Sequence, residues 1–311
     1  MRVLLTGASG FIGSHVLRAL LGGDHEVGIL AMPEDPLRRI SALLPRVTLI
    51  RGTLGGLSRF SEILSAWRPE GCIHLAWYVE PGRYLHAQEN TQCLMESLQL
   101  IRTVAACGCG RVVGAGTCAE YDARLAEDHI PTMYAAAKLA CCLLGRALAQ
   151  QLDIQFAWAR ISYPYGPHED PRRAVPALIH ALLSGHVFPA TPGTQVRDCV
   201  HVEDVASAFV LLLEKGASGI FDIASGVPVT VRQLMETVGA ECGKRELIRF
   251  GALTERPGDP SGVGGNCEPL RALGWTPRYT LAEGLRQTIA WWKANFTEDD
   301  SPAAPRPASM A

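Results

Sequence analysis

Short apolar runs alternate with longer segments of helical periodicity through the first half of the chain. The strand-like runs are residues 3–5, 26–30, 47–51, 72–76, 111–115 and 154–161. The segments between them repeat apolar residues at the spacing of a helix, at residues 12–21, 37–44, 57–66, 89–106 and 132–151. Repeated strand-then-helix units predict an α/β fold, a doubly wound parallel sheet with helices on both faces.

The pattern changes after residue 161, where prolines and glycines become frequent and the segments become short. We expect one domain over residues 1–161 and a smaller, loop-rich lobe over residues 162–294. The second half should cross back to the sheet near residues 197–213 and 219–224 and should include a last helix at 281–293. Residues 295–311 offer little apolar surface to bury, so they are expected to form a disordered tail.

Composition and charge narrow the class of partner. Hydrophobic residues make up 48% of the 311 residues and charged residues 19%, which is enough for a packed core. The formal net charge of -2 argues against a nucleic-acid partner, since such proteins usually carry a concentrated basic surface. No apolar run reaches the length of a membrane span, and the first residues show no secretory signal, so no membrane partner is expected.

Ten cysteines raise the question of disulfides or a metal site. Most lie in apolar segments, and none has the paired C-x-x-C spacing of a zinc site. We therefore expect reduced cysteines that act as small hydrophobic residues in a cytoplasmic protein, with no bound metal.

A glycine-rich loop follows the first strand-like run and opens the first predicted helix. It contains the residues Gly7, Ser9, Gly10, Phe11, Ile12 and Gly13. Three glycines allow a tight turn, a close approach of the backbone to a pyrophosphate, and close packing of helix on strand. The N–H groups at the start of the helix then face the phosphates, so the loop predicts a dinucleotide cofactor bound to a Rossmann domain.

Three polar side chains form a candidate catalytic set. Tyr134 and Lys138 are four residues apart, so they lie one turn apart on the same face of a helix. A phenol has an ordinary pKa of about 10, and a nearby cation lowers it toward neutral pH. Thr117 follows the fifth strand at its carboxyl end, where doubly wound sheets bind ligands. The alternative is an amphipathic surface pair, which the three intervening alanines and the position of Thr117 disfavour.

These motifs together resemble the extended short-chain dehydrogenase/reductase superfamily. The glycine spacing, the Thr117 and Tyr121 pair, and the Tyr134 and Lys138 pair all fit it. Residues 160–167, 197–205, 256–259 and 273–277 are similar to later motifs of its nucleotide-sugar epimerases, dehydratases and reductases. The resemblance spans about residues 1–293 and implies a dinucleotide-binding first domain and a substrate-binding second lobe.

The resemblance also implies roles for individual residues. It makes Thr117, Tyr134 and Lys138 the catalytic residues, with Tyr134 and Lys138 also touching the cofactor. It places three more residues beside the cofactor, which are Leu75, Ala76 and Trp77. Asn90 would support the site, although a simple helix cap is the alternative. Arg197, Arg256 and Asp259 would bind the diphosphate and ribose of a nucleotide-sugar substrate. For His201 and Asp204 we expect a structural pairing where the two domains meet.

Two departures from the family pattern bear on the reaction. Tyr163 stands where the family usually has an asparagine that contacts the substrate, so the pocket is expected to be reshaped. Nucleotide-sugar 4,6-dehydratases carry Asp-Glu directly after the catalytic threonine, whereas this chain has Cys118 and Ala119. Without that acid and base, dehydration is a poor candidate.

The choice of cofactor depends on the end of the second strand. An acid there would bind an unphosphorylated ribose, and none stands at the expected position. Arg38 and Arg39 follow closely, and a guanidinium suits a 2′-phosphate, although both could equally form a solvated helix face. The sequence therefore favours NADP(H) slightly over NAD(H).

The leading hypothesis is reduction of a nucleoside-diphosphate 4-keto-6-deoxy sugar. A 4-epimerase, which oxidises and re-reduces its sugar, is the alternative within the family, and a non-catalytic NAD(P)-binding regulator is the alternative from another class. The resemblance also implies a homodimer through the helices at residues 89–106 and 134–151. Ala140, Cys141 and Gly145 would allow those helices to approach closely.

Overall fold

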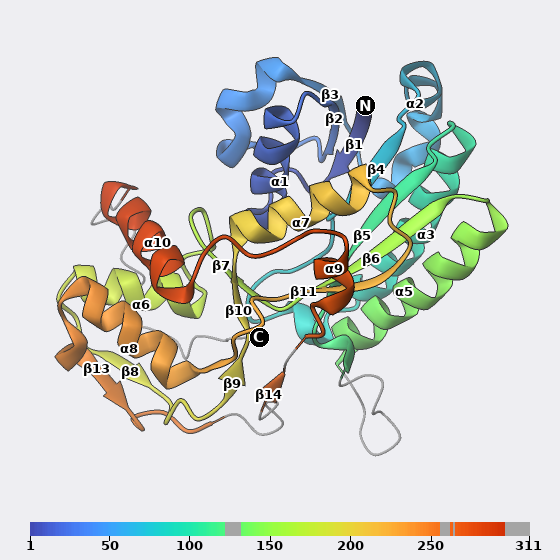
Figure 1. Ribbon diagram of the computed structural model, residues 1–311. Helices are drawn as coiled ribbons and strands as arrows, with labels where there is room; N and C mark the ends of the chain where they lie inside the picture. Colours follow the sequence, from blue (N-terminus) through green and yellow to red (C-terminus); the bar gives the residue numbers. More distant parts are fainter. Residues whose placement is uncertain (122–131, 256–261, 264, 296–311) are drawn as a thin grey trace. The chain divides into compact units, whose positions relative to one another are not determined.

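The computed structural model describes residues 1–121, 132–255, 262, 263 and 265–295. Its main sheet has seven parallel strands in the order β11-β6-β5-β4-β1-β2-β3 (Figure 1). In chain order these strands are β1 (Arg2–Thr6), β2 (Glu26–Ala31), β3 (Val47–Arg51), β4 (Gly71–His74), β5 (Arg111–Thr117), β6 (Gln155–Ile161) and β11 (Gly219–Ile223). The expected doubly wound parallel sheet is confirmed.

Helices cover both faces of this sheet (Figure 1). One face carries α1 (Phe11–Gly22) and α7 (Val202–Glu214), and the other carries α2 (Ser61–Trp67), α3 (Glu89–Ala106) and α5 (Met133–Gln151). The helix expected at residues 37–44 is a 3₁₀ helix, η1 (Arg38–Arg46), and Pro45 lies inside it. The helix expected at 57–66 is divided into η2 (Leu54–Arg59) and α2, with non-helical backbone angles at Gly56.

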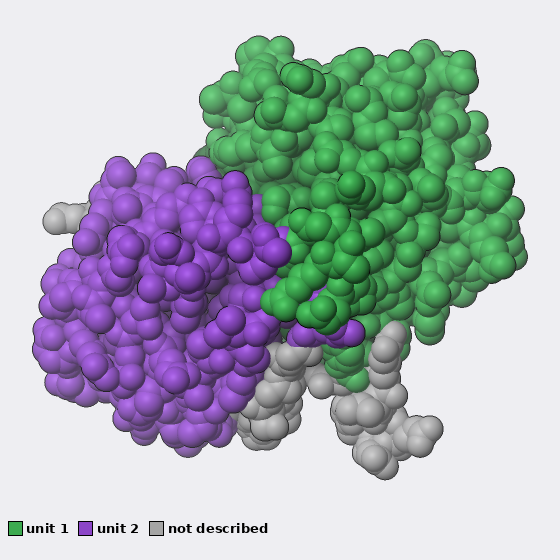
Figure 2. Space-filling view, viewed as in Figure 1, with its two compact units in different colours: residues 1–161, 205–223, 268–275 green, residues 162–204, 224–267, 276–311 purple. Residues whose placement is uncertain are grey.

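The chain forms two compact units, each with its own hydrophobic core (Figure 2). The first unit consists of residues 1–161, 205–223 and 268–275, and it contains α9 (Glu268–Ala272) besides the main sheet. The second consists of residues 162–204, 224–267 and 276–311. The tail expected at residues 295–311 falls, except for Asn295, outside the described residues.

Small sheets and short helices build the described part of the second unit. Its strands pair as β7 (Tyr163–Tyr165) with β10 (Cys199–His201), β9 (Val196–Arg197) with both β12 (Val229–Thr230) and β14 (Gly262–Val263), and β8 (Phe188–Ala190) with β13 (Ile248–Phe250). The helical segments are α6 (Ala174–Leu183), α8 (Val231–Cys242), η4 (Arg245–Leu247) and α10 (Leu281–Asn295). A capping box starts α8, because the Thr230 side chain accepts the Gln233 backbone N–H and the Gln233 side chain accepts the Thr230 backbone N–H.

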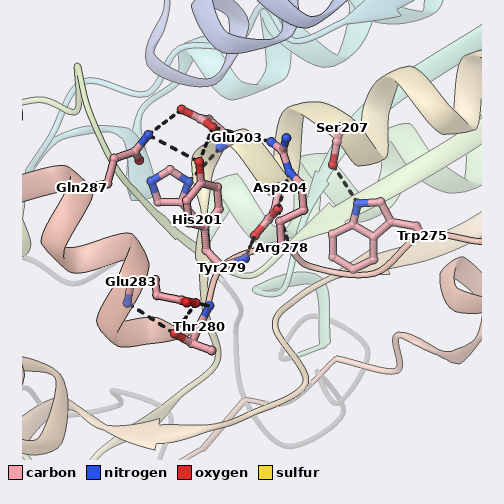
Figure 3. A network of polar contacts seen from close by, with 10 residues as sticks. All are labelled: His201, Glu203, Asp204, Ser207, Trp275, Arg278, Tyr279, Thr280, Glu283 and Gln287. Atoms are coloured by element: carbon pink, nitrogen blue, oxygen red, sulfur yellow. Dashed lines mark hydrogen bonds and ion pairs between the residues drawn. The ribbon is translucent and has the colours of Figure 1, made fainter.

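A polar network in the second unit holds the segment before α10 (Figure 3). The fully buried Asp204 accepts the backbone N–H groups of Arg278 and Tyr279, at 2.9 and 3.2 Å. Tyr279 donates its hydroxyl to Glu203, and its ring lies 4.2 Å from that of His201. For His201 and Asp204 the structure thus shows partners on the Arg278–Tyr279 segment. In the first unit, Trp275 donates to Ser207 (Figure 3).

Three features of the described residues bear on the expectations from the sequence: the state of the cysteines, the burial of small residues on α5, and the length of the helices. All ten cysteines are described and none forms a disulfide. Cys141 and Gly145 were expected at a helix–helix contact with a second copy, but both are buried within the first unit. A Cβ on Gly145 would lie 2.9 Å from Phe156 and 3.4 Å from Ile101, so this glycine serves the packing of α5 on its own sheet. Within the described ranges, none of the helices has the length and apolar character needed to cross a membrane.

Candidate active site

The glycine loop between β1 and α1 leaves no room for side chains at two positions. Gly7 has a φ of +73°, and a Cβ there would lie 2.7 Å from the backbone nitrogen of Ala76. A Cβ on Gly13 would lie 1.9 Å from the carbonyl oxygen of Gly7. Gly10 is the N-cap of α1 and supplies no side-chain cap. The N–H groups of the first turn therefore remain available to a diphosphate, and the loop fits a dinucleotide.

The end of β4 is fixed against this loop by buried hydrogen bonds. Leu75 donates its backbone N–H to Thr6, and Ala76 donates to the Thr6 hydroxyl. The buried His74 ring lies 2.7 Å from both the Thr6 and the Ser97 hydroxyls. Burial, together with the charge of Lys138, lowers the pKa of His74 to about 3. His74 is therefore a neutral structural link rather than a proton donor at physiological pH.

Thr117 and Tyr134 meet at the carboxyl end of β5. Thr117 is the last residue of the strand, and Tyr134 lies in the first turn of α5, behind the N-cap Thr132. The edge-on Tyr84 ring packs 4.8 Å from the Tyr134 ring. Burial raises the pKa of Tyr134 well above its ordinary value, and a hydrogen bond with Thr117 lowers it by less. The phenol therefore holds its proton at neutral pH.

Lys138 is almost fully buried, and its ammonium contacts the end of β5 and the Trp77 ring. Its Nζ donates to the Ala115 carbonyl at 2.8 Å and lies 3.7 Å from the centre of the Trp77 ring. It lies 5.9 Å from the centre of the Tyr134 ring. The expected lowering of the phenol pKa by this ammonium is wrong for the structure, because burial raises the pKa of Tyr134 and the ammonium contacts Trp77 and Ala115.

The ionisation of Lys138 is directly measurable, because the chain has only four lysines, Lys138, Lys215, Lys244 and Lys293. Burial lowers the pKa of Lys138 to about 8. We expect NMR of isotope-labelled lysine to show one ε resonance that titrates near pH 8 and disappears in Lys138→Arg. An ammonium that binds the cofactor must be charged, so cofactor affinity should fall as the pH rises through 8. Four resonances at the ordinary pKa of about 10.4 would contradict this.

Asn90 supports this site rather than capping a helix. It is fully buried in the first turn of α3, whose N-cap is Gln88. Its Oδ1 accepts from the Trp77 indole at 2.8 Å, and its Nδ2 donates to the carbonyls of Tyr84 and Ala87. Asn90 thereby orients Trp77, which contacts the Lys138 ammonium, and Tyr84, which contacts Tyr134.

The loop after β2 places an acid on the glycine loop. The Asp35 carboxylate accepts from the Ser9 hydroxyl and from the backbone N–H of Leu37. Arg39 donates to the Ser9 carbonyl at 3.3 Å, whereas Arg38 is exposed. An acid is indeed missing at the end of β2, where Ala31 stands, but the turn brings one back four residues later. Asp35 was not predicted as a cofactor-binding residue, because the usual acid stands at the end of the second strand and Asp35 comes four residues later.

A second missed residue is Glu120, which is fully buried three residues after Thr117. Its carboxylate accepts the backbone N–H of Thr117 at 2.9 Å. The sequence does contain one indication that Glu120 is buried and functional, since it is an acidic residue within an apolar stretch, between Ala119 and Tyr121.

The expected substrate-binding residues belong to the second unit. Tyr163 lies in β7 and Arg197 in β9, and the Arg197 guanidinium lies 5.0 Å from the centre of the Tyr163 ring. Arg197 is 1% exposed and donates to the Val196 carbonyl. Arg256 and Asp259 lie outside the described residues.

Comparison with known proteins agrees with this geometry. The model of the NAD dependent epimerase/dehydratase family matches residues 3–224. A dTDP-glucose 4,6-dehydratase of Actinoplanes sp. is 27% identical over 95% of this chain and 98% of its own length. A UDP-glucose 4-epimerase of Azospirillum brasilense is 29% identical over 96% of this chain and 93% of its own length.

Solved structures show the same fold. The UDP-glucose 4-epimerase of Thermus thermophilus in complex with NAD is 26% identical, with a TM-score of 0.83 over 95% of this chain and 100% of that one. The dTDP-glucose 4,6-dehydratase of Streptomyces venezuelae, with NAD and TYD bound, is also 26% identical, with a TM-score of 0.81 over 95% of this chain and 98% of that one. The chain therefore belongs to the NAD dependent epimerase/dehydratase family, a family of extended short-chain dehydrogenases/reductases.

Proposed function

We propose that this chain reduces the keto group of a nucleoside-diphosphate 4-keto-6-deoxy sugar. The observation that carries the proposal is the placement of the Tyr134 phenol beside the Thr117 hydroxyl at the carboxyl end of β5, where burial raises the phenol pKa and keeps the group protonated. An alkoxide formed at the sugar carbon needs a proton donor, and a protonated phenol is suited to that task. The oxidation that begins an epimerisation needs a base at the same place, which a phenol of raised pKa supplies less readily.

The residues after Thr117 argue against dehydration. Cys118 and Ala119 carry no carboxyl group that could remove and deliver the elements of water. Glu120 does carry one, but it is fully buried and bound to Thr117, Trp158 and Arg160. A carboxylate held by these donors is not available as an acid or base toward a substrate.

Each residue of the site has a distinct task in the proposed reaction. The nicotinamide cofactor, when bound, supplies the hydride. The glycine loop and the start of α1 would bind the diphosphate of the cofactor, and Lys138 would bind its ribose. Thr117 would orient the sugar oxygen, and Tyr134 would donate its proton to it. We also propose Tyr163, Arg197, Arg256 and Asp259 as substrate-binding residues.

A 4-epimerase is the second candidate, because relatives named UDP-glucose 4-epimerase align over nearly the whole chain. The same three residues, Thr117, Tyr134 and Lys138, would serve both reactions. The two differ in their use of cofactor, since a reductase consumes it and an epimerase regenerates it. A non-catalytic NAD(P)-binding regulator is disfavoured, because Tyr134 and Lys138 are both present.

The proposal is tested by incubating the protein with a panel of 4-keto and ordinary nucleotide sugars. Nicotinamide absorbance and the stereochemistry of the product are followed with NADH and with NADPH. We expect cofactor to be consumed only with keto sugars. Interconversion of ordinary sugars without net consumption would instead identify an epimerase.

The choice of cofactor depends on the groups beside Ser9. The sequence favours NADP(H), through Arg38 and Arg39. Asp35 alters this balance, because a carboxylate accepts a hydrogen bond from a ribose 2′-hydroxyl and repels a 2′-phosphate. We therefore propose NAD(H) as the preferred cofactor, in agreement with the NAD reported for the related structures.

The role of Asp35 can be measured by binding alone. In Asp35→Asn, the ratio of NADH to NADPH affinity should fall by about tenfold, the equivalent of about 1.4 kcal/mol for one lost charge-assisted interaction. Glu34→Gln, which removes an exposed charge next to it, is the control. The proposal is wrong if the wild-type protein binds NADPH more tightly than NADH and Arg39→Ala loses this preference. The preference for NADP(H) expected from the sequence would then hold.

We propose a homodimer through α3 and α5. Four large apolar side chains on these helices are exposed, namely Met95, Met133, Leu143 and Leu144. Such exposure is typical of a protein interface. The double variant Leu143→Glu/Leu144→Glu should be a monomer by light scattering, whereas Val227→Glu, at an exposed site in the second unit, should leave the dimer intact. A monomeric wild-type protein would refute the proposal.

A further inference from the structure

A buried network of charged and aromatic side chains lies behind Thr117 in the first unit. Glu120 accepts the Thr117 backbone N–H, the Trp158 indole N–H and the Arg160 Nε–H, each at 2.9 Å. Arg160 is also paired with Asp222 at 3.9 Å, and Asp222 accepts the hydroxyl of Tyr121. Glu120, Trp158, Arg160 and Asp222 are all buried.

The sequence of β5 is adapted to this network. A Cβ on Gly114 would lie 2.7 Å from the Trp158 ring. A Cβ on Gly116 would lie 2.3 Å from the Trp158 indole nitrogen and 2.6 Å from a Glu120 oxygen. The two glycines of β5 thus leave the space in which the indole and the carboxylate meet.

Glu120 fixes the residue that carries the Thr117 hydroxyl. The carboxylate holds the Thr117 N–H, and the Thr117 Oγ accepts the Ala119 N–H at 3.3 Å. The Thr117 hydroxyl is thus held between the Ala119 N–H and the Tyr134 phenol, with which it forms a hydrogen bond.

We propose that Glu120 is a positioning residue, which sets Thr117 against Tyr134 through the Thr117 backbone and is itself held in place by Arg160 and Trp158. This inference rests on the proposed function, because it assigns Glu120 a part in that same reaction. A carboxylate is needed here, since three N–H donors converge on it. A glutamine would present an NH₂ group to at least one of them and would leave the buried Arg160 with less negative charge nearby.

The charge of Glu120 also acts on Lys138. Burial lowers the pKa of Lys138, and the nearby Cys141, Glu120 and Cys93 raise it. The other groups that face the ammonium are the rings of Trp77, Tyr134 and Trp158, the Ala115 carbonyl and the neutral His74. As a buried carboxylate, Glu120 stabilises the charged form of Lys138.

Two variants separate the position of Glu120 from its charge. Glu120→Gln keeps the length of the side chain and removes the charge. We expect Lys138 to titrate at lower pH than in the wild type and kcat to fall by about 10²-fold, the scale reported for a misplaced catalytic group. Glu120→Asp keeps the charge but withdraws it from Thr117, so kcat should fall while the Lys138 titration stays closer to that of the wild type.

A matched control separates these effects from a general loss of stability. Asp204→Asn removes another fully buried carboxylate that accepts two backbone N–H groups, in the second unit. It should lower the unfolding temperature without moving the Lys138 titration. The proposal is overturned if Glu120→Gln leaves the Lys138 titration unchanged and its loss of kcat equals its loss of folded protein. It is equally overturned if Glu120→Asp, which preserves the charge, has wild-type kcat.

The lysine titration and the unfolding temperature are measured on the protein alone. If the wild-type protein turns over none of the nucleotide sugars, the proposed function fails. The titrations of Glu120→Gln and Glu120→Asp would still show whether Glu120 is coupled to the Lys138 ammonium, so the two failures are distinguishable.

Discussion

Tyr134→Phe is expected to reduce turnover of the keto sugar by about 10²–10⁴-fold, the range for loss of a general acid. The phenol is the group that can donate a proton, because its pKa is raised and the Thr117 hydroxyl lies beside it. Phenylalanine keeps the ring that packs edge-on against Tyr84, so the fold and the cofactor site should be preserved. Cofactor affinity, measured by fluorescence titration, should therefore change little.

Tyr279→Phe is the matched control for this result. It removes a phenol hydroxyl that donates to Glu203 in the second unit, and it should retain most of the turnover. If Tyr134→Phe turns over the keto sugar at the wild-type rate while binding cofactor normally, Tyr134 is not the proton donor and the proposed mechanism is wrong.

Lys138→Met is expected to lower turnover by about 10²-fold or more and also to weaken cofactor binding. This ammonium is the one cation among the described residues that donates to the end of β5, through the Ala115 carbonyl. Methionine has a similar length and no charge, so it should fill the space against Trp77. Since burying the ammonium is costly, as its lowered pKa indicates, the variant should unfold at the wild-type temperature or above it.

Lys215→Met, at an exposed position after α7, is the control for charge removal as such. The combination of lost turnover and retained stability is what distinguishes a functional lysine from a structural one. A variant at Lys138 that unfolds earlier but keeps its turnover per folded molecule would contradict the assignment.

The fold was largely predictable from the pattern of the first half. Its central strands are buried on both faces, so they are continuous apolar runs that stand out from the helical segments. The errors lie where a proline or a glycine interrupts a helical pattern of apolar residues. The segment at 37–44 contains paired arginines and runs into Pro45, and it became a 3₁₀ helix. The segment at 57–66 is interrupted before Ser61.

The positions of the candidate catalytic residues were predictable because they depend on spacing within one element. A tyrosine and a lysine four residues apart fall on one face of α5 wherever that helix lies. The direction of the Tyr134 pKa was not predictable, because it depends first on the burial of the phenol, which the spacing of residues within one helix does not reveal. The structure directs the Lys138 ammonium to Trp77, a residue 61 positions earlier in the sequence.

Asp35 and Glu120 escaped prediction for a related reason. Each acts through a contact that a turn creates, Asp35 with Ser9 and Glu120 with Trp158 and Arg160. Residues that meet across strands leave no regular period in a single sequence. Their chemistry becomes visible only once the order of the strands brings their partners together.

The central claim is that a hydride is transferred to a sugar carbonyl while Tyr134 supplies the proton. It is tested most directly by incubating the protein with a nucleoside-diphosphate 4-keto-6-deoxy sugar and NADH that carries deuterium in the transferable position. We predict a product with one deuterium on the former carbonyl carbon and one cofactor oxidised for each product formed. A product without deuterium, or a keto sugar left unchanged while the cofactor is bound, would contradict the account.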